Sequence, residues 1–195
     1  MDIETPHGPA RALVQEADSA RALLVLGHGA GGGVSAPDLM AATRAALEAN
    51  VSVALIEQPY RVAGRKSQAP APQLDAAWQA VVAALASDVP VITGGRSAGA
   101  RVACRTAEAV GAAGVLCLAF PVHPPGKPEK SRLEELDAVQ VPVLVIQGES
   151  DPFGLPPPRK PNREVIQLPG DHSLKKDLPA LGAAVGDWLE RLLAG

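Results

Sequence analysis

Ser97 lies in a setting that suits nucleophilic chemistry. It is the central residue of Gly95-Arg96-Ser97-Ala98-Gly99, which directly follows the apolar run Val89–Thr93. A serine in a tight turn between a strand and a helix is held in strained backbone geometry, and its neighbours must be small because larger side chains clash there. Such a turn lifts the hydroxyl above the edge of a sheet. The motif predicts a serine nucleophile; the alternative is a glycine-rich turn that only closes a strand.

A serine hydroxyl is a weak nucleophile at neutral pH and requires a base within hydrogen-bond reach. Asp151 comes after the strand-like run Val141–Gln147, and His172 comes after the run Glu164–Leu168. Serine, acid and histidine follow one another in this order in hydrolases with such a turn. Because the carboxyl ends of parallel strands meet at one edge of a sheet, we expect these side chains to come together. His172 would then take the proton of Ser97, and Asp151 would orient the imidazole.

Two further carboxylates lie near these residues. Glu149 and Asp171 are alternative acids for the role given to Asp151. Asp151 is preferred because it completes a Gly-x-x-acid pattern with Gly148, and neither alternative has that placement.

A glycine-rich loop, Gly27-His28-Gly29-Ala30-Gly31-Gly32, follows the first strong strand. Its spacing matches the G-x-G-x-x-G pattern of dinucleotide-binding folds, and Glu57 ends the next strand. A capping-box signature at Ser35 and Asp38, however, starts the following helix beyond the third glycine. Glu57 also lies farther away than a ribose-binding acid, which comes about 20 residues after such glycines. A loop that offers a backbone N–H to an oxyanion is therefore preferred over a nucleotide site.

Together these motifs resemble the α/β-hydrolase superfamily, and within it the compact dienelactone-hydrolase-like branch. The resemblance runs from about Leu23 to Leu193 and rests on the segments 27–32, 94–101, 120–126, 147–152 and 170–174. It implies a single domain over residues 1–195, built as a three-layer α/β/α sandwich around a mostly parallel sheet of about six to seven strands.

The same resemblance implies a serine hydrolase that cleaves a carboxylic ester or similar acyl bond through an acyl-enzyme intermediate, without a metal or cofactor. It places the oxyanion hole at the N–H groups of Ala30 and Ala98, with Gly31 as the donor if the loop is offset by one residue. Because this branch also includes scaffold proteins, a non-catalytic binding or scaffold protein is the second interpretation. A nucleotide-binding oxidoreductase is the third.

The candidate pocket residues are His28, Gly31, Arg96, His123 and Lys127. His28 is expected to fix the oxyanion loop through a backbone hydrogen bond. His123 and Lys127 would either line the mouth of the pocket, facing an acidic group of the substrate, or belong to a rigid loop. Arg96 occupies the variable position of the serine motif, where structural pairing is expected rather than substrate contact.

The pattern along the chain alternates strands with helices, as in a parallel sheet covered on both faces. The predicted strands are Ala22–Leu26, Val51–Glu57, Val89–Thr93, Val115–Phe120, Val141–Gln147 and Glu164–Leu168. The predicted helices are Ala36–Ala49, Pro72–Ala86, Ala98–Val110, Ser131–Ala138 and Lys175–Leu193. Residues 1–21 hold at most one weak strand, Ala12–Val14, so the fold is expected to be trimmed at its N-terminus. The segment between Phe120 and Val141 is too short for a lid domain.

Composition narrows the classes of partner. The chain has 195 residues, which suits one domain, and its net charge of −3 gives no reason to expect nucleic acid or an anionic membrane. No signal peptide is expected, because no cationic start followed by an apolar stretch is seen, and no apolar run approaches the ~20 residues that span a bilayer. Cys104 and Cys117 are expected to be small buried hydrophobic residues. We therefore expect a cytoplasmic protein with a small-molecule ester or acyl substrate.

Overall fold

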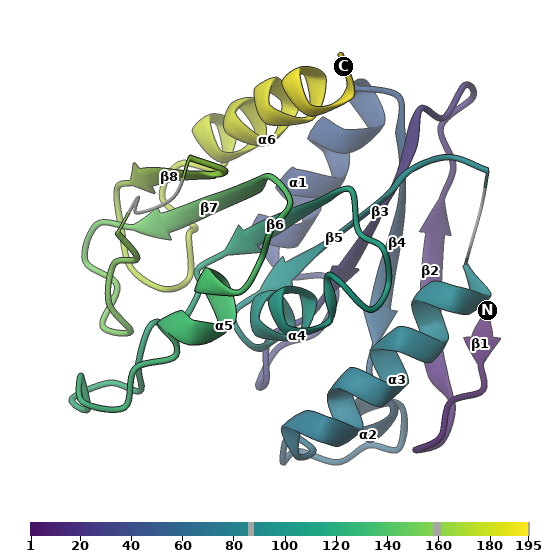
Figure 1. The fold of residues 1–195 in the computed structure, drawn as a ribbon, viewed down its shortest axis with the longest axis horizontal. Helices are drawn as coiled ribbons and strands as arrows, with labels where there is room; N and C mark the ends of the chain where they lie inside the picture. The colour runs from purple at the N-terminus through teal and green to yellow at the C-terminus, as the bar shows by residue number, and fades with distance from the viewer. Residues whose placement is uncertain (86–87, 158–160, 195) are drawn as a thin grey trace.

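The computed structural model describes residues 1–85, 88–157 and 161–194, which form one twisted sheet with helices on both faces (Figure 1). The described residues contain eight strands in the order β1-β2-β4-β3-β5-β6-β7-β8. The strands are β1 (Asp2–Ile3), β2 (Ala10–Gln15), β3 (Ala22–Gly27), β4 (Val51–Glu57), β5 (Val91–Arg96), β6 (Gly114–Leu118), β7 (Val143–Gly148) and β8 (Arg163–Leu168). Strands β3 to β8 run parallel to one another, whereas at one edge β2 pairs antiparallel with β4 and β1 pairs antiparallel with β2.

The N-terminal part of the sheet differs from the sequence prediction. A sheet of six to seven strands was expected, and the prediction of at most one weak strand at residues 12–14 is wrong. Strand β2 covers six residues and pairs antiparallel with β4. Its buried positions are the alanines Ala10 and Ala12, which alternate with the exposed Arg11 and Leu13. Small alanines give a weak hydrophobic alternation, and for that reason the strand is hard to detect from sequence.

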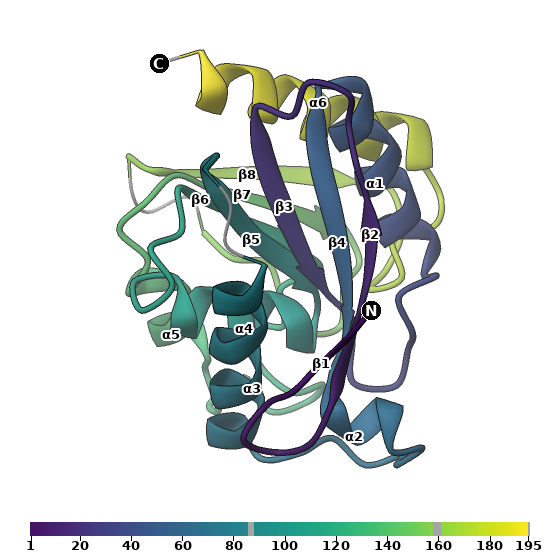
Figure 2. The ribbon, with the colours of Figure 1, turned by 90° about the vertical axis from the view of Figure 1, so that its right-hand side faces the viewer.

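The helices form the two outer layers, which Figure 2 shows on either side of the sheet. The helices are α1 (Pro37–Glu48), α2 (Pro59–Val62), α3 (Ala71–Ala84), α4 (Ala98–Thr106), α5 (Leu133–Asp137) and α6 (Leu178–Leu193). Helices α1 and α6 share one apolar core with one face of the sheet, and α3, α4 and α5 pack on the other face. The short helix α2 was not predicted, and the predicted end of α3 at residue 86 lies outside the described residues.

The central strands are largely apolar because both of their faces are covered. Every residue of β3, β6 and β7 is buried, as expected for parallel strands between two helical layers. Cys104 and Cys117 are free, buried thiols whose Sγ atoms lie 3.5 Å apart between α4 and β6. Their place in the core agrees with the prediction of small hydrophobic residues.

The topology brings four loops to the same edge of the sheet. Strands β3, β5, β7 and β8 are parallel, so the segments that follow them all leave at the carboxyl edge. The connection from β6 to β7, residues 119–142, contains the five-residue helix α5 and no lid domain. Within the described residues, no helix combines the length and the apolar character needed to cross a bilayer.

Candidate active site

Ser97, His172 and Asp151 lie in a continuous hydrogen-bonded series at the carboxyl edge of the sheet. The Nε2 atom of His172 is 2.9 Å from Oγ of Ser97. The Nδ1 atom of the same ring is 2.8 Å from Oδ2 of Asp151, whose side chain is fully buried. With Nδ1–H donating to the carboxylate, Nε2 is free to accept the hydroxyl proton. A hydroxyl, an imidazole and a carboxylate in this arrangement can activate the serine as a nucleophile.

Ser97 sits in a strained turn between β5 and α4. Its φ of 53° and ψ of −106° lie outside the regions that residues with a side chain ordinarily adopt. The turn is held by the Ser97 N–H, which donates to the Leu118 carbonyl at 2.9 Å. A Cβ on Gly99 would overlap the carbonyl oxygen of Gly27. Glycine at position 99 therefore allows the end of β3 to approach the serine turn.

Asp151 is held by two groups besides His172. Gln147, the buried penultimate residue of β7, donates from Nε2 to Oδ2 of Asp151 at 2.8 Å. The same amide lies 3.0 Å from the Phe120 carbonyl and 2.9 Å from the Gly154 carbonyl. The N–H of Phe153 donates to Oδ1 of Asp151 at 2.8 Å. Gln147 thus fixes the carboxylate, a role that was not predicted, although an amide in an otherwise apolar strand is a signal for one.

The loop that carries His172 is packed onto the loop that carries Asp151. Ser150 donates from its N–H and from its Oγ to the Gly170 carbonyl, at 2.9 and 2.8 Å. A Cβ on Gly148 would overlap the Asp171 carbonyl oxygen. These contacts join the two loops into one unit beside the ends of β7 and β8.

The glycine-rich loop after β3 is held by His28. The Nδ1 atom of this buried ring is 2.8 Å from the Gly29 carbonyl, and Nε2 accepts the N–H of Gln58 at 3.1 Å. Burial lowers the pKa of His28 below its ordinary value of 6.5, so the ring is neutral with its proton on Nδ1. Farther along the loop, the Ala30 carbonyl accepts the Tyr60 hydroxyl at 3.2 Å. His28 therefore holds the loop through its hydrogen bond to the loop backbone at Gly29, and Ala30 is held through its carbonyl by Tyr60.

The helix that follows this loop begins differently from the prediction. The capping box at Ser35 and Asp38 is wrong: the N-cap of α1 is Ala36, and no side chain caps it. The Asp38 side chain is fully buried and pairs instead with Arg96, whose Nε lies 2.8 Å from Oδ2 of Asp38. Arg96 also donates from Nη2 to the His172 carbonyl at 3.0 Å. Arg96 thus pairs with groups of the protein, as expected for structural pairing rather than substrate contact.

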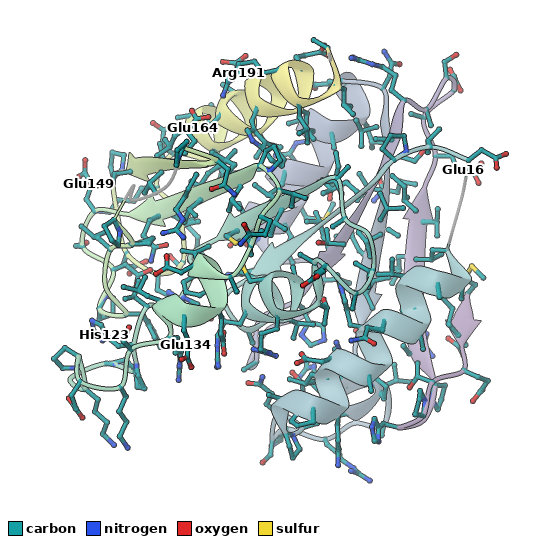
Figure 3. The ribbon with its side chains drawn as sticks, viewed as in Figure 1. Glu16, His123, Glu134, Glu149, Glu164 and Arg191 are labelled. Atoms are coloured by element: carbon teal, nitrogen blue, oxygen red, sulfur yellow. The ribbon has the colours of Figure 1, made fainter. Side chains whose placement is uncertain are left out.

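The remaining candidates lie around the loops at the edge of the site. His123 has its Nδ1 2.9 Å from the Pro124 carbonyl, and its N–H donates to the Phe153 carbonyl at 3.0 Å. Figure 3 shows His123 on the connection after β6, on the side where β7 ends. Lys127 is exposed in a turn of the same connection. The hydrogen bond from His123 to Phe153 ties the β6–β7 connection to the loop after β7, so this connection is held in place by the protein itself.

Neither alternative acid is bonded to the His172 ring in the described residues. Glu149 is exposed, as its position at the margin of Figure 3 shows. Asp171 accepts hydrogen bonds at Oδ1 from the N–H and Oγ of Ser173, and these bonds lower the pKa of its carboxyl. Of the three carboxylates weighed from the sequence, Asp151 is the one bonded to the His172 ring.

Comparisons with known proteins agree with this architecture. A family described as "Alpha/beta hydrolase domain" matches residues 20–177. The chain is similar to a serine hydrolase without a lid from Xanthomonas campestris, with a TM-score of 0.81 and 21% identity over 100% of this chain and 94% of the other. It is also similar to Est1E from Butyrivibrio proteoclasticus (TM-score 0.79, 16% identity, covering 100% and 99%). A dienelactone hydrolase from Anabaena variabilis gives a TM-score of 0.77 at 14% identity, covering 98% and 95%. No curated protein matches the sequence.

Proposed function

Because the chain belongs to the alpha/beta hydrolase domain family, we propose that it is a serine hydrolase that cleaves a carboxylic ester or a similar acyl bond. The observation that carries the proposal is the unbroken contact from Ser97 through His172 to Asp151, at 2.9 and 2.8 Å. The dienelactone hydrolase among the similar structures favours an oxygen ester as the bond that is cleaved.

The chemistry begins at Ser97. His172 Nε2 takes the hydroxyl proton as Oγ attacks the acyl carbon, and it then gives this proton to the leaving alcohol. Asp151 accepts the Nδ1–H bond throughout, so it fixes the tautomer of the ring and stabilises the imidazolium that forms. A water molecule then attacks the acyl-enzyme by the same route, with His172 as its base. Protein groups and water supply every proton transfer in this cycle.

The developing oxyanion needs two donors. We assign them to the N–H of Ala98, the first residue of α4, and the N–H of Ala30, with Gly31 as the alternative in the loop. The N–H of Ala98 is a better donor to an oxyanion because the N-terminus of a helix carries partial positive charge. One such donor contributes about 2.7–4 kcal/mol to transition-state stabilisation in related enzymes.

The space beside the serine turn favours a short acyl group. A small cavity of about 10 Å³ borders Ala98 and is walled by Tyr60, Trp78 and Val102. The connection from β6 to β7 contains only the short helix α5 and forms no lid over the site. Because so little space lies beside Ala98 and no lid encloses the site, we expect a short acyl group, with the alcohol portion directed to solvent.

A fluorophosphonate probe tests the proposal directly. It is expected to label the wild-type protein at Ser97, and Ser97→Ala is expected to lose the label while keeping its circular dichroism spectrum. The p-nitrophenyl esters from acetate to octanoate then test turnover, with the acetate expected to react fastest. Equal labelling of both proteins would overturn the assignment of Ser97. Labelling without turnover of any ester would favour a binding or scaffold protein.

A further inference from the structure

Arg96 contacts the His172 loop, the glycine-rich loop and helix α1. It directly precedes Ser97 in the chain, and its Nη2 donates to the backbone carbonyl of His172 at 3.0 Å. Its Nε lies 2.8 Å from Asp38 in the first turn of α1. A Cβ on Gly29 would come within 3.0 Å of its Nη1, so the guanidinium also packs closely against the glycine-rich loop.

Asp38 anchors this guanidinium to the core. Its side chain is 0% exposed, and its Oδ1 accepts the N–H of Leu39 at 2.9 Å. Helix α1 itself is packed against α6 and the sheet. A buried carboxylate without its partner is strongly unfavourable, so the pair confines the Arg96 side chain to one place.

His172 is the catalytic group that most needs such support. It is 75 residues from Ser97 in the sequence and follows β8, the strand at the edge of the sheet. Asp151 holds the ring of His172, whereas Arg96 holds its backbone carbonyl. The planar fork of a guanidinium can serve Asp38 and His172 at once, which a lysine ammonium cannot reproduce.

We propose that Arg96, tethered by Asp38, is a positioning residue that keeps His172 in line with Ser97. The inference rests on the proposed hydrolase function and deepens it. Arg96 touches neither substrate nor reacting atoms in this scheme, and it acts through the His172 backbone and the packing of the Gly29 loop. Its loss therefore lowers kcat and leaves KM unchanged, since the acyl pocket keeps its walls.

The test compares Arg96→Met, Arg96→Lys and Asp38→Asn with a matched control, Arg105→Met. Arg105 lies on α4 and pairs with Asp75 and Glu135, away from His172, and its side chain is 17% exposed against 19% for Arg96. With p-nitrophenyl acetate, Arg96→Met is expected to lose about 10- to 100-fold in kcat, because misplacement of a catalytic group by 1 Å costs on the order of 100-fold. Arg96→Lys and Asp38→Asn are expected to fall in kcat as well, with KM within about twofold in each case. The control is expected to change the melting temperature and keep its kcat.

A second readout does not depend on turnover. We expect a low-field NMR signal from the Nδ1–H that His172 donates to Asp151, and we expect it to broaden or disappear in Arg96→Lys and to persist in Arg105→Met. If Arg96→Met does not fold, Arg96→Lys carries the test. Unchanged kcat and an intact signal in a folded Arg96 variant would overturn the proposal, as would a raised KM at constant kcat. If the wild type neither turns over esters nor labels, the hydrolase proposal fails, and the NMR comparison still decides the role of Arg96.

Discussion

The ring of Phe153 stacks on the imidazole of His172, with the ring centroids 4.1 Å apart and the planes at 29°. Phe153 also donates its N–H to Oδ1 of Asp151. This one residue, two positions after Asp151, therefore contacts both the proposed acid and the proposed base. The stack restricts rotation of the imidazole about its side-chain bonds. It therefore complements the Asp151 bond, which fixes only one edge of the ring.

Replacing Phe153 tests this restraint. Phe153→Ala is expected to lower kcat about two- to tenfold, since an aromatic pair is worth about 0.5–1.5 kcal/mol beyond its buried area. Phe153→Tyr keeps the ring and serves as the control, with kcat expected near that of the wild type. Steady-state kinetics on p-nitrophenyl acetate measures both. An unchanged kcat in Phe153→Ala would show that Asp151 alone orients His172.

Removal of the carboxylate tests the assignment of the acid. Asp151→Asn is expected to lose about 10⁴-fold in kcat, because an amide at this position holds the wrong tautomer of the histidine. Glu149→Gln is the matched control: it removes an exposed charge from the same loop and is expected to keep its activity. A large loss in Glu149→Gln with an active Asp151→Asn would reverse the assignment.

The serine turn makes a prediction about stability. Gly99→Ala places a Cβ against the Gly27 carbonyl, and we expect the free energy of unfolding to fall by about 1–3 kcal/mol, with a loss of labelling at Ser97. Gly186→Ala is the control in α6, where a Cβ meets nothing within 4 Å. It is expected to stabilise by about 1 kcal/mol through helix propensity. Urea unfolding of both variants measures the contrast, and equal effects would refute the packing argument.

His28 gives a pH dependence with a definite sign. Because burial lowers its folded pKa below 6.5, the unfolded chain binds a proton first as the pH falls. The wild type therefore loses stability below that pH, by at most about 1.4 kcal/mol per pH unit from this group. His28→Gln removes the titration, so its free energy of unfolding is expected to vary less between about pH 8 and about pH 5.5. Urea unfolding at both pH values tests this, with exposed His7→Gln as the control; parallel curves for wild type and His28→Gln would contradict it.

The sequence predicts much of the fold because the central strands are continuously apolar and parallel. That pattern, with glycines at the ends of β3 and β5, is enough to place Ser97, Asp151 and His172 at one edge. Strand β2 was underestimated because its buried side chains are alanines that alternate with polar or exposed residues.

The errors within the site come from contacts between distant segments. Asp38 matches a helix-capping pattern, but its true partner, Arg96, reaches it only in the folded chain. Gln147 and Phe153 were missed for a similar reason: their contacts with Asp151 and His172 depend on the path of one loop. Local patterns predict helix starts and strand ends, whereas these pairings depend on tertiary packing.

The strands that precede Ser97 and His172 are not neighbours in the sheet, because β6 and β7 lie between β5 and β8. The hydroxyl and the imidazole therefore meet only when all of these strands have paired in register, since a slip of one residue turns side chains to the opposite face. Reactivity at Ser97 is thus a reporter of folding across this half of the sheet. During refolding, covalent labelling should recover with the slowest structural phase and lag behind the return of helical circular dichroism.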